Sequence, residues 1–530
     1  MMDHRLQIAD CRMNQPTTLG SYNGKSAFCI VLAVGLALLL TSCSQRPDPR
    51  TLVMIIESSP ANLDPRIGTD AQSERIDELL FDGLLTRDEH FELQPGLTER
   101  WETPDPLTYV FHLRRGVRFH DGRPLAARDV KWTFDSLRDG TVISAKASTY
   151  RFVERIETPD DATVIFRMKE PYATLPWNVS SGAIGIVPYG SGRDFGRAPV
   201  GSGPFRLVRA QADSEVVIER NPDYWGEKAK IPRVRFAVVP DATTRALELR
   251  KGSADVAINA LPADTVAELR REGSLAVEQA PGTIYAYLAF NLRDPLLKDV
   301  RVRQALAYAI DRRPLLEYLW RGMARPAESV LPPEHWAFAS DLPRQSYDPK
   351  AAMRLLSEAG YAPGAEGVRF HLTMKTSTEE SSRLLAAVLQ QQLREVGIAL
   401  DIRSHEFGTF YSDVVHGSFQ MYSLRWIGGN EDPDIFEHVF HSASFPPKRA
   451  NRSYYANPRV DALIDQARRE TDEARRKPLY AELQRIVAHD LPYINLWYLD
   501  NVLVHSRRVR NLKLSPSGNY DFLKTAELAP

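Results

Sequence analysis

The positions of the cysteines constrain this chain more than any other feature of its sequence. The 530 residues contain three, Cys11, Cys29 and Cys43, all near the N-terminus. Everything after Cys43 therefore lacks the means to form an internal disulfide, and its fold has to be stabilised by a hydrophobic core. With 43% hydrophobic and 25% charged residues, the composition is that of an ordinary globular protein, and the length allows two or three domains.

Cys43 also closes a segment that is typical of a secretory signal. A cation, Lys25, precedes an apolar run over residues 27–40, which is shorter than the about 20 apolar residues that cross a bilayer. The run ends in Leu-Thr-Ser-Cys, which resembles the lipobox of bacterial lipoproteins, whose cysteine is acylated. We expect a signal peptide over 1–42, a lipidated tether over 43–50, and a periplasmic or otherwise extracytoplasmic protein held to the membrane by its lipid. The alternative is a plain N-terminal membrane anchor with an incidental cysteine.

Beyond the tether, strand and helix patterns alternate along the chain. A continuous apolar run over 52–56 predicts a strand that is covered on both faces. Alternating apolar residues predict half-buried strands at 109–113 and 164–168. Helices are expected over these segments: 74–85, 241–251, 299–319, 381–396 and 472–489. This mixed order, without a repeat of fixed period, predicts a large α/β protein with several lobes.

The motifs of common reaction centres are missing from the sequence. It has no Gly-x-Ser-x-Gly nucleophile elbow, no His-Glu-x-x-His and no phosphate-cradling loop. His438 and His441 could share a helix face, but they lack an evident third metal ligand. Asp432 and Asp434 could form a catalytic pair, although two acids in a turn more often cap backbone groups. We therefore predict no catalytic residue, no metal site and no cofactor, and a secreted hydrolase stays open only as an alternative without an assignable residue.

A distinctive segment covers residues 111–122 and reads Phe-His-Leu-Arg-Arg-Gly-Val-Arg-Phe-His-Asp-Gly. Further strings lie at 62–65, 80–84, 95–101, 126–130, 201–205, 221–225, 252–255, 299–305, 309–312 and 432–434. In this order, the strings resemble the family 5 extracellular solute-binding proteins, which are the peptide, dipeptide and nickel receptors of ABC importers. The resemblance extends from about Leu52 to Tyr498, and it departs from the family at Arg128, where an acid is usual.

The resemblance implies a two-lobed periplasmic-binding-protein type II fold with an additional domain. Lobe I would comprise residues 51–80, 188–283 and 500–530, and lobe II residues 284–499. Residues 81–187 would form the additional β-rich domain of lobe I. The two lobes would close over the ligand around a hinge.

The same resemblance implies a monomeric receptor, not an enzyme, that delivers peptides to the permease subunits of an ABC importer. A net charge of -1 without a long basic run argues against nucleic acid as a partner. Two alternatives remain beside the hydrolase: a receptor for a non-peptide solute, such as a metal chelate or an oligosaccharide, and a surface or scaffold protein without a ligand.

In the family's peptide receptors, an aspartate three residues after a cleft tryptophan holds the amino terminus of the peptide. Here the tryptophan is Trp426, and the third residue after it is Gly429. The ligand site that the resemblance implies includes Trp426, Gly428, Gly429, Asn430, Glu431 and Asp434. A buried ammonium without a counter-charge is costly. Either Glu431 replaces the missing carboxylate, or the ligand has no buried amine.

Two residues outside this segment complete the expected site. The dipeptide receptors hold the ligand's carboxylate with an arginine at about the place of Lys375, which could serve as a point charge. Asn291, at the end of a predicted strand, is either a ligand contact or a hinge or cap residue. Trp426 could equally be packed in the core.

Overall fold

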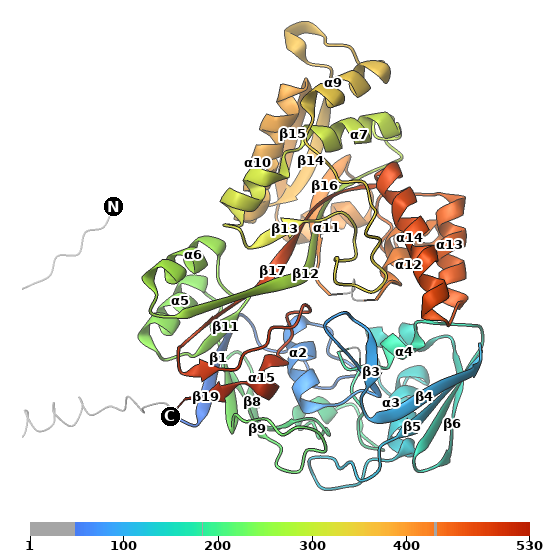
Figure 1. The fold of residues 1–530 in the computed structure, drawn as a ribbon, viewed down its shortest axis with the longest axis vertical. Helices are drawn as coiled ribbons and strands as arrows, with labels where there is room; N and C mark the ends of the chain where they lie inside the picture. The colour runs from blue at the N-terminus through green and yellow to red at the C-terminus, as the bar shows by residue number, and fades with distance from the viewer. Residues whose placement is uncertain (1–47, 183, 429–431, 530) are drawn as a thin grey trace, which may run out of the picture. The chain divides into compact units, whose positions relative to one another are not determined.

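The computed structural model describes residues 48–182, 184–428 and 432–529 (Figure 1). Residues 50–530 form one compact unit. Cys43 and the expected signal peptide lie outside the described residues, as do Gly429, Asn430 and Glu431. Over the described ranges, no helix combines the length and the apolar character that would let it cross a membrane.

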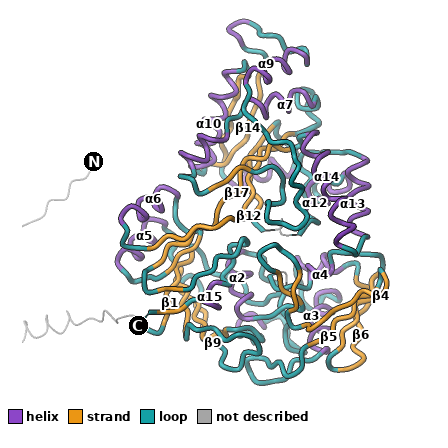
Figure 2. The backbone as a smooth tube through the Cα atoms, in the orientation of Figure 1, coloured by secondary structure: helices purple, strands orange, loops and turns teal. Residues whose placement is uncertain are grey.

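One sheet of 11 strands organises this α/β unit (Figure 2). In sheet order its strands are β15 (Ile398–His405), β14 (Phe370–Ser377), β16 (Met421–Trp426), β12 (Ala276–Phe290), β17 (Tyr493–His505), β11 (Val256–Ile258), β1 (Thr51–Ile56), β10 (Arg233–Val238), β9 (Glu215–Arg220) and β8 (Phe205–Gln211), with β13 (Ala324–Pro326) beside β17. The mixed α/β class expected from the sequence is confirmed.

Two long strands, β12 and β17, connect the two halves of this sheet. They pair with each other in antiparallel fashion along most of their length. On one side β17 pairs with β11, and on the other β12 pairs with β16. The register shifts between Ala280 and Ile284. A side chain at Gly282 would place its Cβ 2.3 Å from the carbonyl oxygen of Leu499, so this crossing needs a glycine.

The apolar run at 52–56 forms most of β1, and every residue of that strand is buried. β1 pairs in parallel with β10 on one side and with β11 on the other. Its alternate side chains enter different core clusters, Met54 one and Val53 the other. The prediction of a strand covered on both faces is therefore confirmed.

A second sheet lies within residues 81–187, which we call the β-rich region. It is antiparallel, in the order β4 (Thr98–Asp105), β5 (Thr108–Leu113), β7 (Thr163–Met168) and β6 (Val153–Asp160). Helix α3 (Ala127–Arg138) packs on it, and Phe134 meets Phe166 edge to face with 5.2 Å between ring centroids. Two small antiparallel pairs lie outside these sheets: β2 (Leu85–Arg87) with β3 (Leu93–Pro95), and β18 (Val509–Arg510) with β19 (Glu527–Leu528).

The other helices lie along the chain between these strands. They are α2 (Ala71–Leu80), α4 (Leu175–Asn178), α5 (Ala242–Lys251), α6 (Ala263–Glu272), α7 (Val300–Ala309), α8 (Arg312–Pro314), α9 (Pro349–Glu358), α10 (Glu380–Glu395), α11 (Phe407–Val415), α12 (Ile435–Phe440), α13 (Pro458–Arg469), α14 (Glu473–Asp490) and α15 (Phe522–Thr525). Short 3₁₀ and π turns are η1 (Ala145–Tyr150), η2 (Phe195–Arg197), η3 (Leu315–Leu319), η4 (Ala365–Gly367) and η5 (Ser442–Ser444).

Helix boundaries agree with the sequence where cap residues define them. In α5, the carboxylate of Asp241 accepts a hydrogen bond from the backbone N–H of Thr244 at 2.7 Å. Gly252 ends the helix in the left-handed conformation, with φ 77°, which glycine adopts without strain.

Two predicted helices are longer than the observed ones. The helix expected over 74–85 ends at Leu80, because Phe81 is already extended. The helix expected over 299–319 breaks after Ala309, where Ile310 is extended and the Asp311 carboxylate accepts from the N–H of Arg313 at 3.0 Å. The amphipathic period continues across this break, so the apolar pattern alone does not reveal it.

Several of the strings that carry the family resemblance meet at Asp82, which is 8% exposed. Its carboxylate accepts hydrogen bonds at 2.9 to 3.0 Å from three side chains, those of Ser202, Tyr224 and Trp225. Burial raises the pKa of Asp82, and the three hydrogen bonds oppose that rise. Nearby, a Cβ on Gly201 would lie 1.8 Å from the carbonyl oxygen of Leu80. These strings therefore build the scaffold of the fold.

Candidate ligand-binding site

A cavity of about 540 Å³ lies at the carboxyl ends of β14 and β16. These strands are parallel, so their ends meet at one edge of the sheet, where α/β proteins usually bind ligands. The first turns of α10 and α11 and two tryptophans, Trp320 and Trp497, complete its lining. This edge therefore has the size and the position of a ligand site.

Arg425 supplies a positive charge to this cavity. It precedes Trp426 on β16, and successive residues of a strand point to opposite faces. Its Nη2 lies 3.4 Å from Oε2 of Glu379, and both side chains are partly exposed, at 37% and 48%. The Glu379 carboxylate also accepts hydrogen bonds from the hydroxyls of Ser381 and Ser382, at 2.5 and 2.8 Å. Burial tends to raise the pKa of Glu379, but these hydrogen bonds and the charge of Arg425 lower it overall.

Two tryptophans and an apolar rim form further parts of the cavity walls. The Nε1 atoms of Trp320 and Trp497 are buried, and neither has a hydrogen-bond partner among the described residues. Phe407 and Ile427 stand at the rim with exposed side chains, at 54% and 62%. A buried N–H without an acceptor is unfavourable. The cavity therefore suits a ligand that combines a carboxylate or carbonyl oxygen with an apolar group.

Trp426, the predicted cleft tryptophan, packs on the other side of β16. In the ladder between β16 and β12, Trp426 lies opposite Tyr285. Its ring meets that of His438 edge to face, with 5.7 Å between the ring centroids. The guanidinium of Arg452 lies 5.5 Å from the same ring. The indole is half-buried against the core, yet its Nε1 has no hydrogen-bond partner among the described residues. Its ligand role stays a prediction.

The segment after Trp426 is described at both ends. Gly428 has φ 67°, and a Cβ added there would meet no atom of the described residues within 4 Å. At the far end, Asp434 pairs with Arg468, with 2.6 Å between Oδ1 and Nε. The carboxylate of Asp432 accepts from the backbone N–H of Asp434 at 2.8 Å. Asp434 is thus held by an arginine, and Asp432 acts as the backbone cap that two acids in a turn favour.

The titration of Asp432 gives a testable pH dependence. Burial, followed by the charge of Asp434, raises the pKa of Asp432 to about 7. The folded protein therefore holds a proton that the unfolded chain releases near pH 4. Because the folded state binds the extra proton, this residue makes the free energy of unfolding fall as pH rises from about 4 to 7. Asp432→Asn should remove that loss. The free energy of unfolding of the variant, compared with that of the wild type, should therefore be more favourable at pH 8 than at pH 5. Urea unfolding at both pH values measures this difference; Asp194→Asn, at an exposed acid (83%), is the control and should show none.

Lys375 and Asn291 are both engaged by the protein. Lys375 Nζ lies 2.6 Å from Oδ2 of Asp413. Asn291 is 7% exposed, and its amide donates to the backbone carbonyls of Gly417 and Phe419 at 3.1 and 3.0 Å. These bonds agree with the cap alternative for Asn291. A ligand role for either residue stays a prediction, and for Lys375 it would require breaking an ion pair.

His438 and His441, the two histidines considered as metal ligands, make different contacts within the protein. Burial lowers the pKa of His438 to about 4, and its ring packs on Trp426. His441 Nδ1 accepts a hydrogen bond from the N–H of Ala443 at 2.9 Å. In the part of the chain that the structure describes, no group of three or more His, Cys, Asp or Glu side chains is arranged to hold a metal ion.

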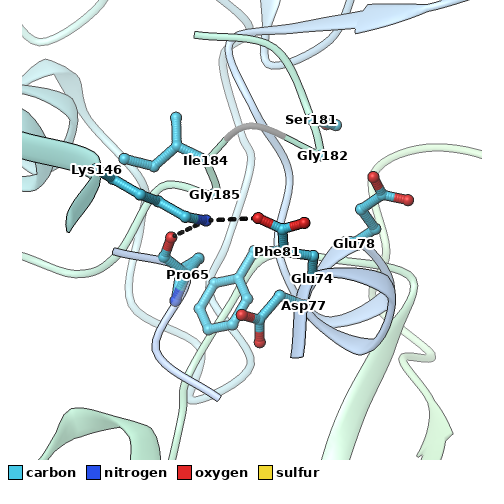
Figure 3. Close-up of a pocket in the computed structure, with 10 residues that line it drawn as sticks. All are labelled: Pro65, Glu74, Asp77, Glu78, Phe81, Lys146, Ser181, Gly182, Ile184 and Gly185. Carbon is cyan, nitrogen blue, oxygen red and sulfur yellow. Dashed lines mark hydrogen bonds and ion pairs between the residues drawn. The ribbon is translucent and has the colours of Figure 1, made fainter. Parts of the chain in front are cut away.

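A much smaller cavity lies between α2 and residues of the β-rich region (Figure 3). Its volume is about 10 Å³, which accommodates no more than a water molecule. Lys146 Nζ donates to the carbonyl of Pro65 at 3.1 Å and lies 3.6 Å from Oε1 of Glu74. Burial raises the pKa of Asp77 well above its ordinary value. This small pocket belongs to the scaffold and is too small for a solute.

None of the residues that line the cavity at the ends of β14 and β16 was predicted from the sequence as a site residue, and Trp320, Glu379, Arg425 and Trp497 are among those missed. One signal was available for Arg425, because strand alternation sets it opposite Trp426. Trp320 and Trp497 come from segments far apart in the chain, and no local pattern indicates that they meet.

A model of the family described as Bacterial extracellular solute-binding proteins, family 5 Middle, matches residues 92–445. Among curated proteins, the dipeptide-binding protein of Escherichia coli K12 is 28% identical over 524 residues, which is 93% of this chain and 97% of that protein.

Solved structures of similar proteins cover almost all of the chain. DppA from Helicobacter pylori, in complex with the peptide STSA, has a TM-score of 0.73 and 26% identity, and the match covers 91% of this chain and 98% of that one. NikZ from Campylobacter jejuni, in complex with Ni(L-His), has a TM-score of 0.76 and 25% identity, covering 90% and 100%. The two-lobed periplasmic-binding-protein type II fold that we expected is thereby confirmed.

Proposed function

Because the chain belongs to the bacterial extracellular solute-binding proteins of family 5, we propose that it is a lipid-anchored receptor that delivers peptides to an ABC importer. Members of this family are binding proteins, so the chain is a receptor and not an enzyme. Its partners would be the permease subunits of the importer, and it would act as a monomer outside the cytoplasm. The assignment of lobe I to 51–80, 188–283 and 500–530, and of lobe II to 284–499, is part of this proposal.

The cavity at the ends of β14 and β16 is the observation that carries the choice of peptides. Arg425 would take the carboxylate of the ligand in place of Glu379, and the N–H groups of Trp320 and Trp497 would donate to its oxygens. Phe407 and Ile427 would contact an apolar side chain. The dipeptide-binding protein of Escherichia coli and the peptide complex of DppA support this ligand class by their names.

The amino end of such a peptide needs a counter-charge. Gly429 stands where the peptide receptors have an aspartate, so we propose that Glu431 takes this role beside Trp426. Gly428, Asn430 and Asp434 would shape the segment around it. Lys375 and Asn291 would contribute only if they leave their present partners.

A non-peptide solute is the second candidate. The glycine at 429 favours it, because a metal chelate or an oligosaccharide has no ammonium group to neutralise. The complex of NikZ with Ni(L-His) shows that a structurally similar protein holds a ligand of that kind.

Native mass spectrometry of what co-purifies with residues 44–530 separates these candidates. This form keeps the whole compact unit that begins at Arg50. A set of mixed peptides is the expected result and would also give the preferred length. A single non-peptide mass would contradict the peptide proposal. If the protein is empty, isothermal titration with a dipeptide and tripeptide library decides the question.

Lipid attachment depends on Cys43. In Cys43→Ala, the precursor should incorporate no fatty acid, because the acylated thiol is gone, and lipoprotein-type processing should stop. Fatty-acid labelling in a bacterial host measures this. Cys29→Ala removes a cysteine inside the apolar run and is the matched control, which should be labelled normally. A normally labelled Cys43→Ala protein would refute the lipid anchor.

A further inference from the structure

The strands β10, β9 and β8, which follow β1 at one end of the main sheet (Figure 1), carry four arginines. These are Arg206 and Arg209 of β8, and Arg233 and Arg235 of β10. In each of these two strands, one arginine lies opposite Glu219 of β9 and the other opposite Val217. Glu219 and Val217 are two residues apart on a strand, so all four arginines project from the same face of the sheet. We call these four residues the arginine face.

The arginine face has more positive than negative charge. Glu215 and Glu219 of β9 each form ion pairs with one arginine of β8 and one arginine of β10. The hydrogen bond from Arg235 is the main cause that lowers the pKa of Glu215, so this carboxylate keeps its charge at neutral pH. Four guanidinium groups therefore surround two carboxylates, which leaves a local charge of +2.

The surplus charge is accessible from outside. The arginine side chains are 41% to 56% exposed, whereas those of Glu215 and Glu219 are only 11% and 27% exposed. A guanidinium group matches the oxygens of a phosphate with two parallel hydrogen bonds. The arginines stand on the two outer strands of three, which are about 10 Å apart. This spacing suits an array of phosphates better than a single small anion.

The first strand of the fold begins beside the arginine face. Thr51, the first residue of β1, lies opposite Arg233 of β10. In the sequence, seven residues separate Thr51 from Cys43, the residue that we propose to be acylated. A chain of that length reaches at most about 30 Å. A bilayer that holds the lipid of Cys43 would therefore lie within reach of this end of the sheet.

We propose that the arginine face docks on the anionic phospholipid headgroups of the membrane to which the protein is anchored. The choice of a membrane as the partner rests on the proposed lipid anchor. The binding itself depends on described residues of the sheet alone. The whole chain has a net charge of -1, so attraction to an anionic surface has to come from a local excess of positive charge.

Vesicle flotation with the soluble form of residues 44–530 tests this docking without the lipid. We expect the protein to float with vesicles made of equal parts of phosphatidylcholine and phosphatidylglycerol at low salt. It should not float with phosphatidylcholine alone, and high salt should weaken the binding because it screens the charges. Arg206→Gln combined with Arg209→Gln removes the surplus charge and leaves each glutamate its arginine on β10. This double variant should partition onto the anionic vesicles about 5- to 30-fold less.

Two further variants separate a local face from a change in total charge. Arg313→Gln combined with Arg485→Gln removes the same number of charges from exposed arginines outside the main sheet and should bind as the wild type does. Arg206→Lys combined with Arg209→Lys keeps the charge and should retain most of the binding. If circular dichroism shows that the glutamine double variant is unfolded, Arg209→Gln alone, at an arginine that is 56% exposed, carries the test and should lose about 5-fold.

Absence of wild-type binding to the anionic vesicles at low salt would overturn the inference. So would equal losses in the two glutamine double variants, which would indicate an effect of total charge. Complete displacement by inorganic phosphate at constant ionic strength would show that the face takes a free anion and not a membrane. If fatty-acid labelling refutes the acylation of Cys43 while vesicle binding depends on the arginine face, the proposed anchor fails and the docking surface is still confirmed.

Discussion

Replacing Arg66 with methionine should lower the free energy of unfolding by about 3–5 kcal/mol. Arg66 and Asp64 are both fully buried, with 2.8 Å between Nη2 and Oδ2. The five N–H donors of this guanidinium all find acceptors: both oxygens of Asp64, the hydroxyl of Ser136, and the carbonyls of Ser191 and Gly192. Without the arginine, the carboxylate of Asp64 has no counter-charge in a place that water does not reach.

Urea unfolding followed by circular dichroism measures this effect. The matched control is Arg123→Met, because its pair with Asp121 is exposed (55% and 34%) and should contribute only about 0–1 kcal/mol. The double variant Arg66→Met with Asp64→Leu should be less damaged than Arg66→Met alone, since it leaves no unpaired charge. Equal losses in Arg66→Met and Arg123→Met would show that Asp64 finds another partner.

Arg425→Gln should weaken the binding of a peptide with a free carboxylate by about 10- to 100-fold, the effect of losing hydrogen bonds to a charged group worth about 1.5–3 kcal/mol. Glu379→Gln should act in the opposite direction. Glu379 now lies 3.4 Å from Arg425, so it competes with the ligand's carboxylate. Isothermal titration calorimetry with one peptide gives both values.

The C-terminally amidated form of the same peptide tests whether the carboxylate is what Arg425 holds. It should bind the wild type about as weakly as the free acid binds Arg425→Gln, and the substitution should barely affect it. Arg394→Gln, at the exposed end of α10, should leave both affinities unchanged. If Arg425→Gln weakens acid and amide equally, Arg425 shapes the cavity without recognising the carboxylate.

The parts of the fold that the sequence predicts well are those whose cause is local. The strand at 52–56 is a continuous apolar run, and α5 carries its own cap residues at Asp241 and Gly252. The end of α2 at Leu80 depends instead on contacts with Gly201 and Gly203, which lie against its last carbonyl groups. Such a boundary is decided by tertiary packing, and the local pattern does not contain it.

The candidate site shows the same difference between features with a local cause and features that depend on tertiary packing. The segment from Trp426 to Asp434 stands out in the sequence because it resembles a family string, and Gly429 stands out because it departs from it. The cavity beside Arg425 depends on Trp320 and Trp497 coming together from separate segments. Three of the strings that carry the family resemblance, at 80–84, 201–205 and 221–225, meet at the buried Asp82, so these strings say more about the scaffold than about the ligand.

Strand β17 dictates an order of assembly for the molecule. It follows every other strand of the main sheet in the chain, yet it lies at the centre of that sheet, between β12 and β11. Until residues 493–505 are available, the two halves of the main sheet present open edges at β11 and at β12, and open strand edges are prone to pair with other chains. Folding has to wait for contacts of high sequence separation and is expected to be slow. A chain that emerges N-terminus first would therefore need protection from aggregation until residues 493–505 arrive.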